Sequence, residues 1–133
     1  MGYLVDTDIL IYRLTQKYPQ VQQKMGLVAP ADLFISAITV AELYFGAYNS
    51  TYVQKNLALL EEMLPQLNIL PFNSQTGRIF GQIKADLKQR GEIVNDSDLF
   101  IAATALAHNL TLVTNNEKHF QRINKLNIEN WTQ

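Results

Sequence analysis

Two carboxylates stand one residue apart in the stretch LVDTDILIY, which spans residues 4–12 and is otherwise largely apolar. They belong to Asp6 and Asp8. Burying an unpaired carboxylate costs several kcal/mol, or the group takes up a proton instead. A strand that only filled a core would gain nothing from these acids, so they predict a polar site at the end of a buried segment.

Polar residues also mark the ends of other apolar segments. Glu42 lies in a segment with helical spacing, and Asp96 and Asp98 stand at the start of a strongly apolar run. Thr114 ends a further apolar run and is followed closely by Asn116. Spacing alone does not rank Asp96 against Asp98.

The apolar pattern alternates between short runs typical of strands and longer segments with helical spacing. This alternation predicts an α/β fold, in which helices cover both faces of a mostly parallel sheet of about five strands. The 133 residues suit a single domain, 1–133. Gly26 and Gly91 are expected to end the second and fifth helices. Strands are expected at 2–6, 32–38 and 110–114 and within LNILPF and KLNIENW, and helices at about 8–17, 19–26, 39–48, 52–64, 74–90 and 98–108.

Parallel α/β sheets bind ligands beyond the carboxyl ends of their strands. Asp6 is expected to end the first strand, and Ser36 and Thr114 are expected at the matching positions of two other strands. Glu42 follows the second strand, and Asp98 begins the buried helix. The topology therefore predicts that acids from separate segments meet at one edge of the sheet.

Each of these residues also has a purely structural explanation. Asp6 could cap a helix, and Glu42 could close a capping box with the threonine three residues before it. Asp8 and Asp98 could simply favour the dipole in the first turn of a helix. Asn116 is typical of a turn. Chance would have to bring all of them to the same edge.

Carboxylates that cluster in a crevice repel one another, and the loss of solvent adds to the cost. A Mg²⁺ or Mn²⁺ ion would relieve the repulsion, because both ions prefer carboxylate oxygen. Such an ion can activate water and neutralise a phosphodiester in the transition state. The net charge of −1 argues against binding nucleic acid through bulk positive charge, but a metal would still allow a polyanion to bind.

Composition excludes several other classes of site. The chain contains no cysteine, so a disulfide, a thiolate metal site and a cysteine nucleophile are excluded. No apolar run approaches the roughly 18–20 residues of a membrane span, and the first residues lack a signal-like pattern. We expect a cytoplasmic protein. His108 is expected to end an apolar helix, and His119 to lie near the proposed edge as a surface residue.

Four stretches, taken together, resemble the PIN-domain ribonucleases, and within them the VapC toxins of type II toxin–antitoxin systems. These stretches have the order and spacing typical of that family. The resemblance implies a PIN domain, which is a three-layer α/β/α sandwich. It also implies a Mg²⁺- or Mn²⁺-dependent endoribonuclease with tRNA or ribosomal RNA as its target. The four stretches are YLVDTDILIY, ISAITVAELYFGA, DSDLFIAATALAHNLTLVTNNEKHF and INKLNIENW.

The resemblance also assigns roles to residues. Asp6 and Asp98 match metal-binding acids of the family, and Glu42 matches the acid placed across the metal site. Asn116 stands where many members have a fourth acid, which makes a second metal less expected. Thr114 resembles the hydroxyl residue beside the site. The expected catalytic residues are Asp6, Glu42, Asp98 and Asn116, with Asp6 and Asp98 as metal ligands and Thr7 and Thr114 in support.

The family also implies partners. Its members usually form homodimers and are inhibited by a cognate VapB-type antitoxin that inserts into the site, so both kinds of assembly are expected. Aromatic residues within 44–52 would, if exposed, form an apolar patch for an antitoxin helix or a second copy. Most cations near the site are expected to be merely solvated. Those that could contact RNA are Lys84, Lys88, Arg90, Lys118 and Arg122.

Two alternatives remain open. The stretch LVDTDIL also matches the strand and D-x-D pattern of haloacid-dehalogenase-type phosphatases, in which Asp6 would be the nucleophile and Asp8 a general acid. The expected small residues after the second aspartate are missing, because Ile9 and Leu10 follow it. The other alternative is a PIN-like binding module with an inactive site, which Asn116 favours and three intact acids oppose.

Overall fold

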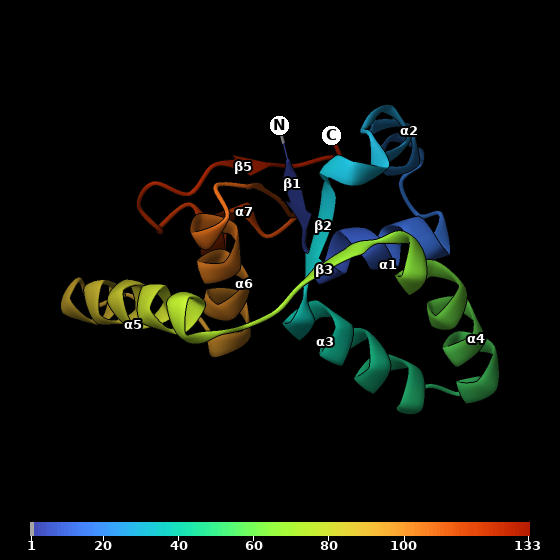
Figure 1. Cartoon of the computed structure of the whole chain (residues 1–133), viewed down its shortest axis with the longest axis horizontal. Helices are drawn as coiled ribbons and strands as arrows, with labels where there is room; N and C mark the ends of the chain where they lie inside the picture. The colour runs from blue at the N-terminus through green and yellow to red at the C-terminus, as the bar shows by residue number, and fades with distance from the viewer. Residues whose placement is uncertain (1) are drawn as a thin grey trace.

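The computed structural model describes residues 2–133. A five-stranded parallel sheet forms the centre of the protein. The strand order is β3-β2-β1-β4-β5, and every neighbouring pair is parallel. The predicted α/β class is therefore confirmed (Figure 1). The strands are β1 (Tyr3–Val5), β2 (Leu33–Ser36), β3 (Asn68–Leu70), β4 (Thr111–Val113) and β5 (Ile128–Glu129).

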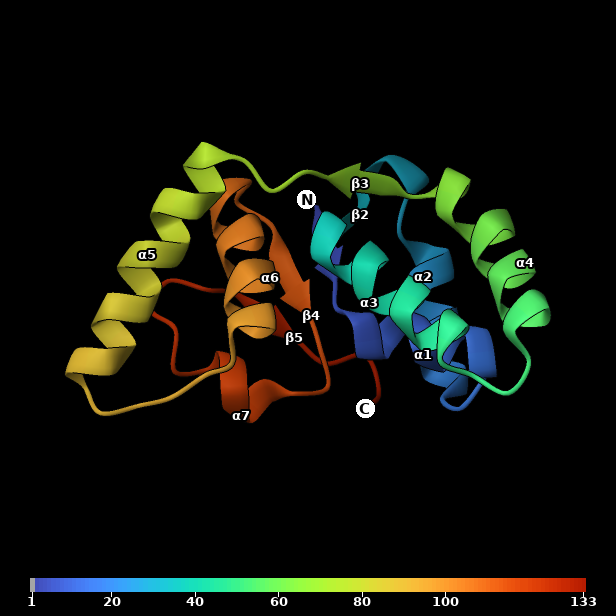
Figure 2. The same ribbon diagram turned by 90° about the horizontal axis from the view of Figure 1, so that it is seen from below.

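Helices connect the strands and cover both faces of the sheet. Figures 1 and 2 show α5 and α6 on one side of the strands and α1 to α4 on the other, so the predicted three-layer arrangement is confirmed. The helices are α1 (Thr7–Thr15), α2 (Pro19–Leu27), α3 (Ala37–Tyr48), α4 (Val53–Met63), α5 (Ser74–Gln89), α6 (Asp96–Ala107) and α7 (Glu117–Phe120), with short 3₁₀ turns η1 (Pro30–Asp32) and η2 (Leu64–Gln66).

Alternation along the strands creates two apolar cores. Val5 and Val113 belong to the core beneath α1 to α4, whereas Leu4 and Leu112 belong to the core beneath α5 and α6. All four side chains are essentially inaccessible to solvent. Successive strand residues point to opposite faces, so strands buried on both sides read as continuous apolar runs. That is why LVD and TLV contain no internal polar residue.

Helix α6 is the most deeply buried helix because small and branched apolar residues occupy nearly every face. Ala102, Ala103 and Ala105 are fully buried, and they allow α6 to pack closely between the sheet and α5. Its first turn is fixed by Asn95, whose side chain accepts a hydrogen bond from the Asp98 backbone N–H at 2.9 Å. The buried helix thus presents its amino end at the carboxyl edge of the sheet.

Several boundaries differ from the sequence-based expectation. Gly26 lies within α2, which continues to Leu27 and ends with Val28 in an extended conformation. The short helix α7 was not predicted. Gly91 does end α5 as expected: it adopts φ +71°, a conformation that favours glycine. No helix among residues 2–133 is long and apolar enough to span a bilayer.

The two-sided burial of the central strands has a measurable consequence. Leu112→Ala should lower the free energy of unfolding by about 2–5 kcal/mol, because it leaves a cavity under a fully buried side chain. Leu27→Ala is the matched control, since that leucine is 86% exposed and should change stability by less than about 0.5 kcal/mol. Urea denaturation measures both. Equal losses would contradict the described burial.

Candidate active site

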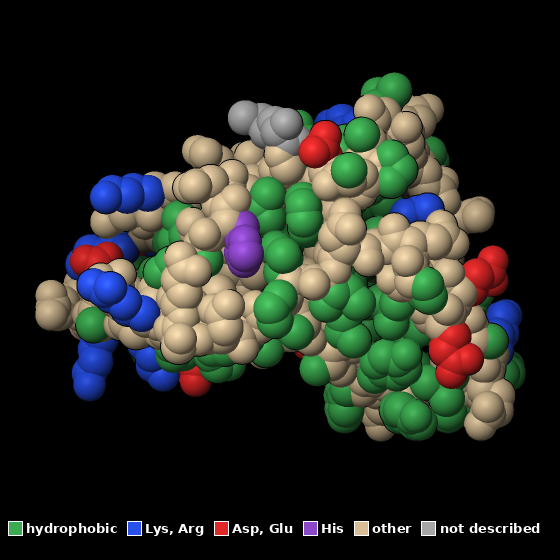
Figure 3. Space-filling model, in the orientation of Figure 1, with side chains coloured by type: hydrophobic (Ala, Val, Ile, Leu, Met, Phe, Trp, Pro, Cys, Tyr) green, Lys and Arg blue, Asp and Glu red, His purple; other side chains and the backbone are tan. Residues whose placement is uncertain are grey.

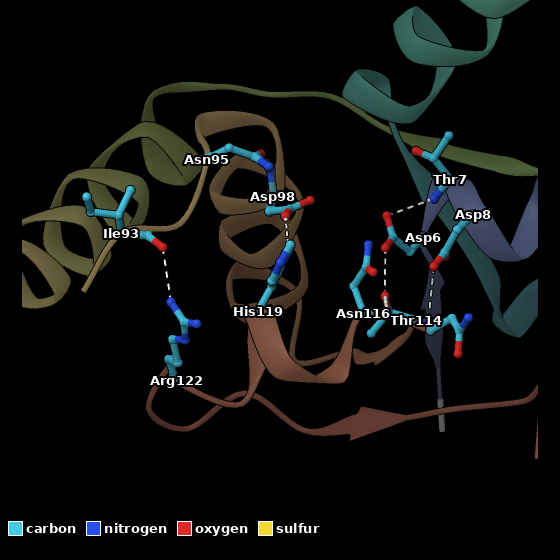
Figure 4. A network of polar contacts seen from close by, with 11 residues as sticks. Asp6, Thr7, Asp8, Ile93, Asn95, Asp98, Thr114, Asn116, His119 and Arg122 are labelled. Atoms are coloured by element: carbon cyan, nitrogen blue, oxygen red, sulfur yellow. Dashed lines mark hydrogen bonds and ion pairs between the residues drawn. The ribbon is translucent and has the colours of Figure 1, made fainter.

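The pairing of β1 with β4 builds the centre of the site. Val5 lies opposite Val113, and the Asp6 backbone N–H donates to the Val113 carbonyl at 2.9 Å. The next residues on the two strands therefore emerge side by side. The Thr114 hydroxyl donates to Asp6 Oδ2 at 2.7 Å (Figure 4). Asp6 and Thr114, both predicted site residues, thus meet at the carboxyl edge of the sheet.

Asp6 is a buried acid with both oxygens occupied. It is 4% exposed, and its Oδ1 accepts the Thr7 N–H at 2.8 Å as the N-cap of α1. The capping explanation is therefore correct, although it accounts for one oxygen only. Burial raises the pKa of Asp6 to about 7, and the charge of Asp8 adds to this increase. The hydrogen bonds from Thr114 and Thr7 act in the opposite direction.

Asp8 lies in the first turn of α1 and also binds a loop on the other side of the site. Its Oδ1 accepts the Ile9 N–H at 2.7 Å, and its Oδ2 accepts the Asn115 N–H at 3.1 Å. It thereby ties the start of α1 to the loop after β4. Burial also raises the pKa of Asp8. The D-x-D spacing marks Asp8 as a possible site residue in the sequence. Its contact with Asn115, 107 residues away, could not be predicted because it depends on the tertiary fold.

Asp98 reaches the same edge from the first turn of α6. Its charge contributes to the raised pKa of both Asp6 and Asp8, so the three carboxylates are electrostatically close. On its outer side, Asp98 Oδ2 lies 3.1 Å from Nδ1 of His119 on α7. Figure 4 shows this pair on one side of Asn116, with Asp6 and Asp8 at the start of α1 on the other. His119 was expected to be a surface residue, and it is a half-exposed neighbour of a candidate ligand.

Glu42 is connected to the centre through Thr7. The Thr7 hydroxyl lies 2.7 Å from Glu42 Oε1, while the Thr7 backbone N–H binds Asp6. The proposed capping box is wrong, because α3 begins earlier: Ser36 is its N-cap and accepts the Thr39 N–H at 3.1 Å. Glu42 therefore lies in the second turn, where its side chain is free of a capping role.

Asn116 takes part in the site through its backbone. Its N–H donates to the Thr114 hydroxyl oxygen at 3.0 Å, which orients that hydroxyl toward Asp6. Its carbonyl accepts the His119 N–H at 3.0 Å in α7. Asn116 was expected in a turn, and it lies at the N-cap of α7 without a capping hydrogen bond from its side chain. Its amide side chain is exposed at the edge.

These groups suit a hard cation held by few protein ligands. Among residues 2–133, no group of three or more acidic or histidine side chains is arranged closely enough to hold a metal by itself. Mg²⁺ typically uses one or two carboxylates and keeps several waters, which a site built on Asp6 and Asp98 would allow. The buried Asp6 and the partly buried Asp8 and Asp98 repel one another and offer only oxygen ligands, which fits such an ion.

Comparison with known proteins agrees with this architecture. Residues 3–126 match the PIN domain. The chain is 38% identical over 131 residues to ribonuclease VapC2 of Haemophilus influenzae, covering 98% of each chain. It is 32% identical to the tRNA(fMet)-specific endonuclease VapC of Shigella flexneri, covering 99% of each chain. The crystal structure of VapBC2 from Rickettsia felis, bound to a promoter DNA fragment, contains a similar chain with TM-score 0.91, 34% identity and coverage of 98% and 99%.

The fold and the acidic edge are those of a PIN domain, and the chain belongs to the PIN-domain family. Within that family it belongs with the VapC ribonucleases. The resemblance inferred from the four stretches is therefore confirmed. The haloacid-dehalogenase alternative is wrong, because the chain belongs to a different family. Asp8 accepts hydrogen bonds from two backbone amides in this site.

The buried acids predict an unusual pH dependence. Folding raises the pKa of Asp6 from 3.8 to about 7, so its contribution to stability is complete below about pH 4 and is lost as the pH rises toward 7. In metal-free protein above about pH 7, Asp6→Asn should therefore raise the free energy of unfolding. The upper limit is roughly 4 kcal/mol, at about 1.4 kcal/mol for each pKa unit.

Urea denaturation in EDTA at about pH 5 and about pH 8 measures this effect. The difference between variant and wild type should be larger at the higher pH. Asp32→Asn, in η1 at the opposite end of β2, is the control and should show no such difference. A variant that is equally destabilised at both pH values would contradict the burial of a repelled charge at Asp6.

Proposed function

We propose that this chain is a Mg²⁺- or Mn²⁺-dependent endoribonuclease, acting as the toxin of a type II toxin–antitoxin pair. The observation that carries the proposal is the buried Asp6 carboxylate, which faces the charges of Asp8 and Asp98 in a chain of the VapC ribonuclease family. Such a cluster is costly without a cation, and a divalent ion would make it compatible with a phosphodiester substrate.

The residues around the cluster would have different roles in the reaction. Asp6 and Asp98 would hold the ion, which when bound would supply positive charge to the phosphodiester and lower the pKa of a water. Thr7 and Thr114 keep the Asp6 carboxylate in one orientation, because each donates to a different oxygen. Glu42 would orient the attacking water, and Asn116 would offer its exposed amide to water or substrate. Attack by the water oxygen would form a new bond to phosphorus as the bond to the leaving ribose oxygen breaks. The water gives up one proton, and the ribose oxygen takes up one.

Substrate class is proposed from the relatives. One relative is a tRNA(fMet)-specific endonuclease and another is named a ribonuclease. We therefore propose RNA, with tRNA as the first candidate and ribosomal RNA as the second.

The proposed antitoxin is a VapB-type protein, since several similar chains were solved in VapBC complexes. An exposed apolar patch formed by Phe45, Tyr48 and Tyr52 supports a protein partner. These residues are 70%, 65% and 69% exposed, so the condition that the sequence left open for such a patch is met. Figure 3 shows hydrophobic side chains gathered over the region of α3 and α4. The same patch would also suit a homodimer.

Cleavage assays test the proposal directly. Purified, antitoxin-free protein is incubated with total tRNA and with ribosomal RNA in Mg²⁺, in Mn²⁺ and in EDTA. Discrete fragments should appear with either ion and disappear in EDTA. Asp98→Asn should lower the rate at least about 100-fold, because it removes the charge of a ligand while keeping its shape.

Asp32→Asn serves as the matched control and should cleave like the wild type, since Asp32 lies at the other end of β2 from the site. Fragments that persist in Asp98→Asn would contradict the assignment of the site. A folded wild-type protein that binds metal and RNA but never cleaves would favour an inactive binding module.

A further inference from the structure

A hollow lies between α5 and the start of α6, and its lining includes Leu99, the residue that follows the candidate ligand Asp98. It has a volume of about 500 Å³. Leu87, Val94 and Leu99 line it with apolar surface, and each of them is less than 10% exposed. The floor of this groove is therefore apolar and is made of buried side chains. Ile93 lines the same groove and is 88% exposed.

Charges of both signs border this groove, and one lysine among them has no ionic partner in the described residues. Lys84 and Lys88 line the groove from α5, and Glu92 lines it from the loop after this helix. Arg90 pairs with both Asp86 at 2.9 Å and Glu92 at 3.3 Å, and Lys84 is paired with Asp96 at 2.9 Å. Lys88 forms no ion pair among residues 2–133. Figure 3 shows Lys and Arg side chains gathered at the end of the molecule that α5 forms.

Covalent and polar links connect the groove to the acids. Leu99 on the groove floor directly follows Asp98, the candidate metal ligand. On the same side, Arg122 donates from Nη1 to the Ile93 carbonyl at 3.1 Å and so fixes the rim. In Figure 4, Ile93 and Arg122 lie to one side of Asp98 and His119, and Asp6 lies to the other. An RNA strand bound at the acids would pass Asp98 and His119 on its way to the groove.

An apolar floor with lysine at the border matches the chemistry of a nucleotide. Bases splayed out of an RNA strand commonly stack on aromatic or arginine side chains, and an aliphatic surface also removes their flat faces from water. Phosphates pair with lysine. A lone exposed isoleucine is ordinary on a protein surface. Here it shares a groove with a buried apolar floor, with Lys88, which has no ionic partner among residues 2–133, and with Leu99, which follows Asp98. That combination favours a nucleotide over an apolar peptide.

We propose that this groove binds one nucleotide of the RNA beside the scissile phosphodiester, with the base on Ile93 and the apolar floor and a phosphate on Lys88. The inference rests on the proposed ribonuclease function and adds to it a subsite that selects the neighbouring base. It assigns binding to Ile93 and Lys88, and no part of the chemical step.

Binding of a short RNA tests the subsite separately from cleavage. Each variant is made in the full-length Asp98→Asn chain, and the Kd is measured by fluorescence anisotropy with a labelled single-stranded RNA of about a dozen nucleotides and random sequence. Ile93→Ala should weaken binding about threefold to tenfold. The loss should vanish with an abasic oligomer of equal length, because that probe has no base to lose.

Lys88→Gln should act differently. It should lower the slope of log Kd against log salt by about 0.7, the value for one phosphate contact with a single strand, on both the RNA and the abasic probe. Two matched controls have no expected effect: Leu27→Ala, which removes an 86% exposed leucine from α2, and Lys55→Gln, on the exposed face of α4. Thermal unfolding verifies that all variants are folded.

The outcomes separate the subsite from the proposed function. If the wild-type chain cleaves RNA but Ile93→Ala and Lys88→Gln bind like the two controls, the subsite is wrong and the ribonuclease stands. If Ile93→Ala weakens the RNA and the abasic probe equally, no base lies on Ile93. If it alters self-association instead of RNA affinity, the groove serves a second copy of the chain, which also overturns the proposal. Specific losses in a chain that never cleaves would support the subsite and overturn the proposed function.

Discussion

The pairing of β1 with β4 forces one carboxylate out of solvent, and the rest of the site is arranged around it. Because Val5 lies opposite Val113, Asp6 and Thr114 leave the sheet together, and the backbone gives Asp6 little freedom to turn away. Its two oxygens are held by Thr114 and Thr7. Two hydrogen bonds do not offset the loss of water and the repulsion from Asp8, so the pKa stays high. A group held in this state is prepared for a cation.

The remaining elements set the distance of other charges from that carboxylate. Helix α1 starts on Asp6 and carries Asp8, which fastens the loop after β4 through Asn115. The alanine-rich packing of α6 fixes the height of Asp98 above the sheet edge. Thr7 connects Glu42 on α3 to the same centre. A chain with a net charge of −1 thus concentrates negative charge at one edge, while lysines and arginines gather at the end formed by α5.

The topology rule explains why much of the site could be predicted from sequence. Alternating strands and helices require a parallel sheet, and the carboxyl ends of its strands bring Asp6 and Thr114 to one edge. Contacts that involve loops could not be predicted from the sequence. The interaction of Asp8 with Asn115 and that of His119 with Asp98 depend on a loop and a four-residue helix that have no apolar period. Glu42 was ambiguous because a capping box depends on where α3 starts, and a shift of the N-cap to Ser36 removes that possibility.

A crystal structure of the protein soaked with Mn²⁺, with anomalous diffraction recorded at the manganese edge, tests the central claim most directly. The account predicts one anomalous peak at about 2.0–2.2 Å from a carboxylate oxygen of Asp6 and of Asp98, with water completing the coordination. It also predicts that Asp98→Asn weakens or removes this peak while Thr114 still donates to Asp6. Full occupancy by manganese elsewhere, with both carboxylates bare, would contradict the account, because the desolvated cluster would then have no cation to stabilise it.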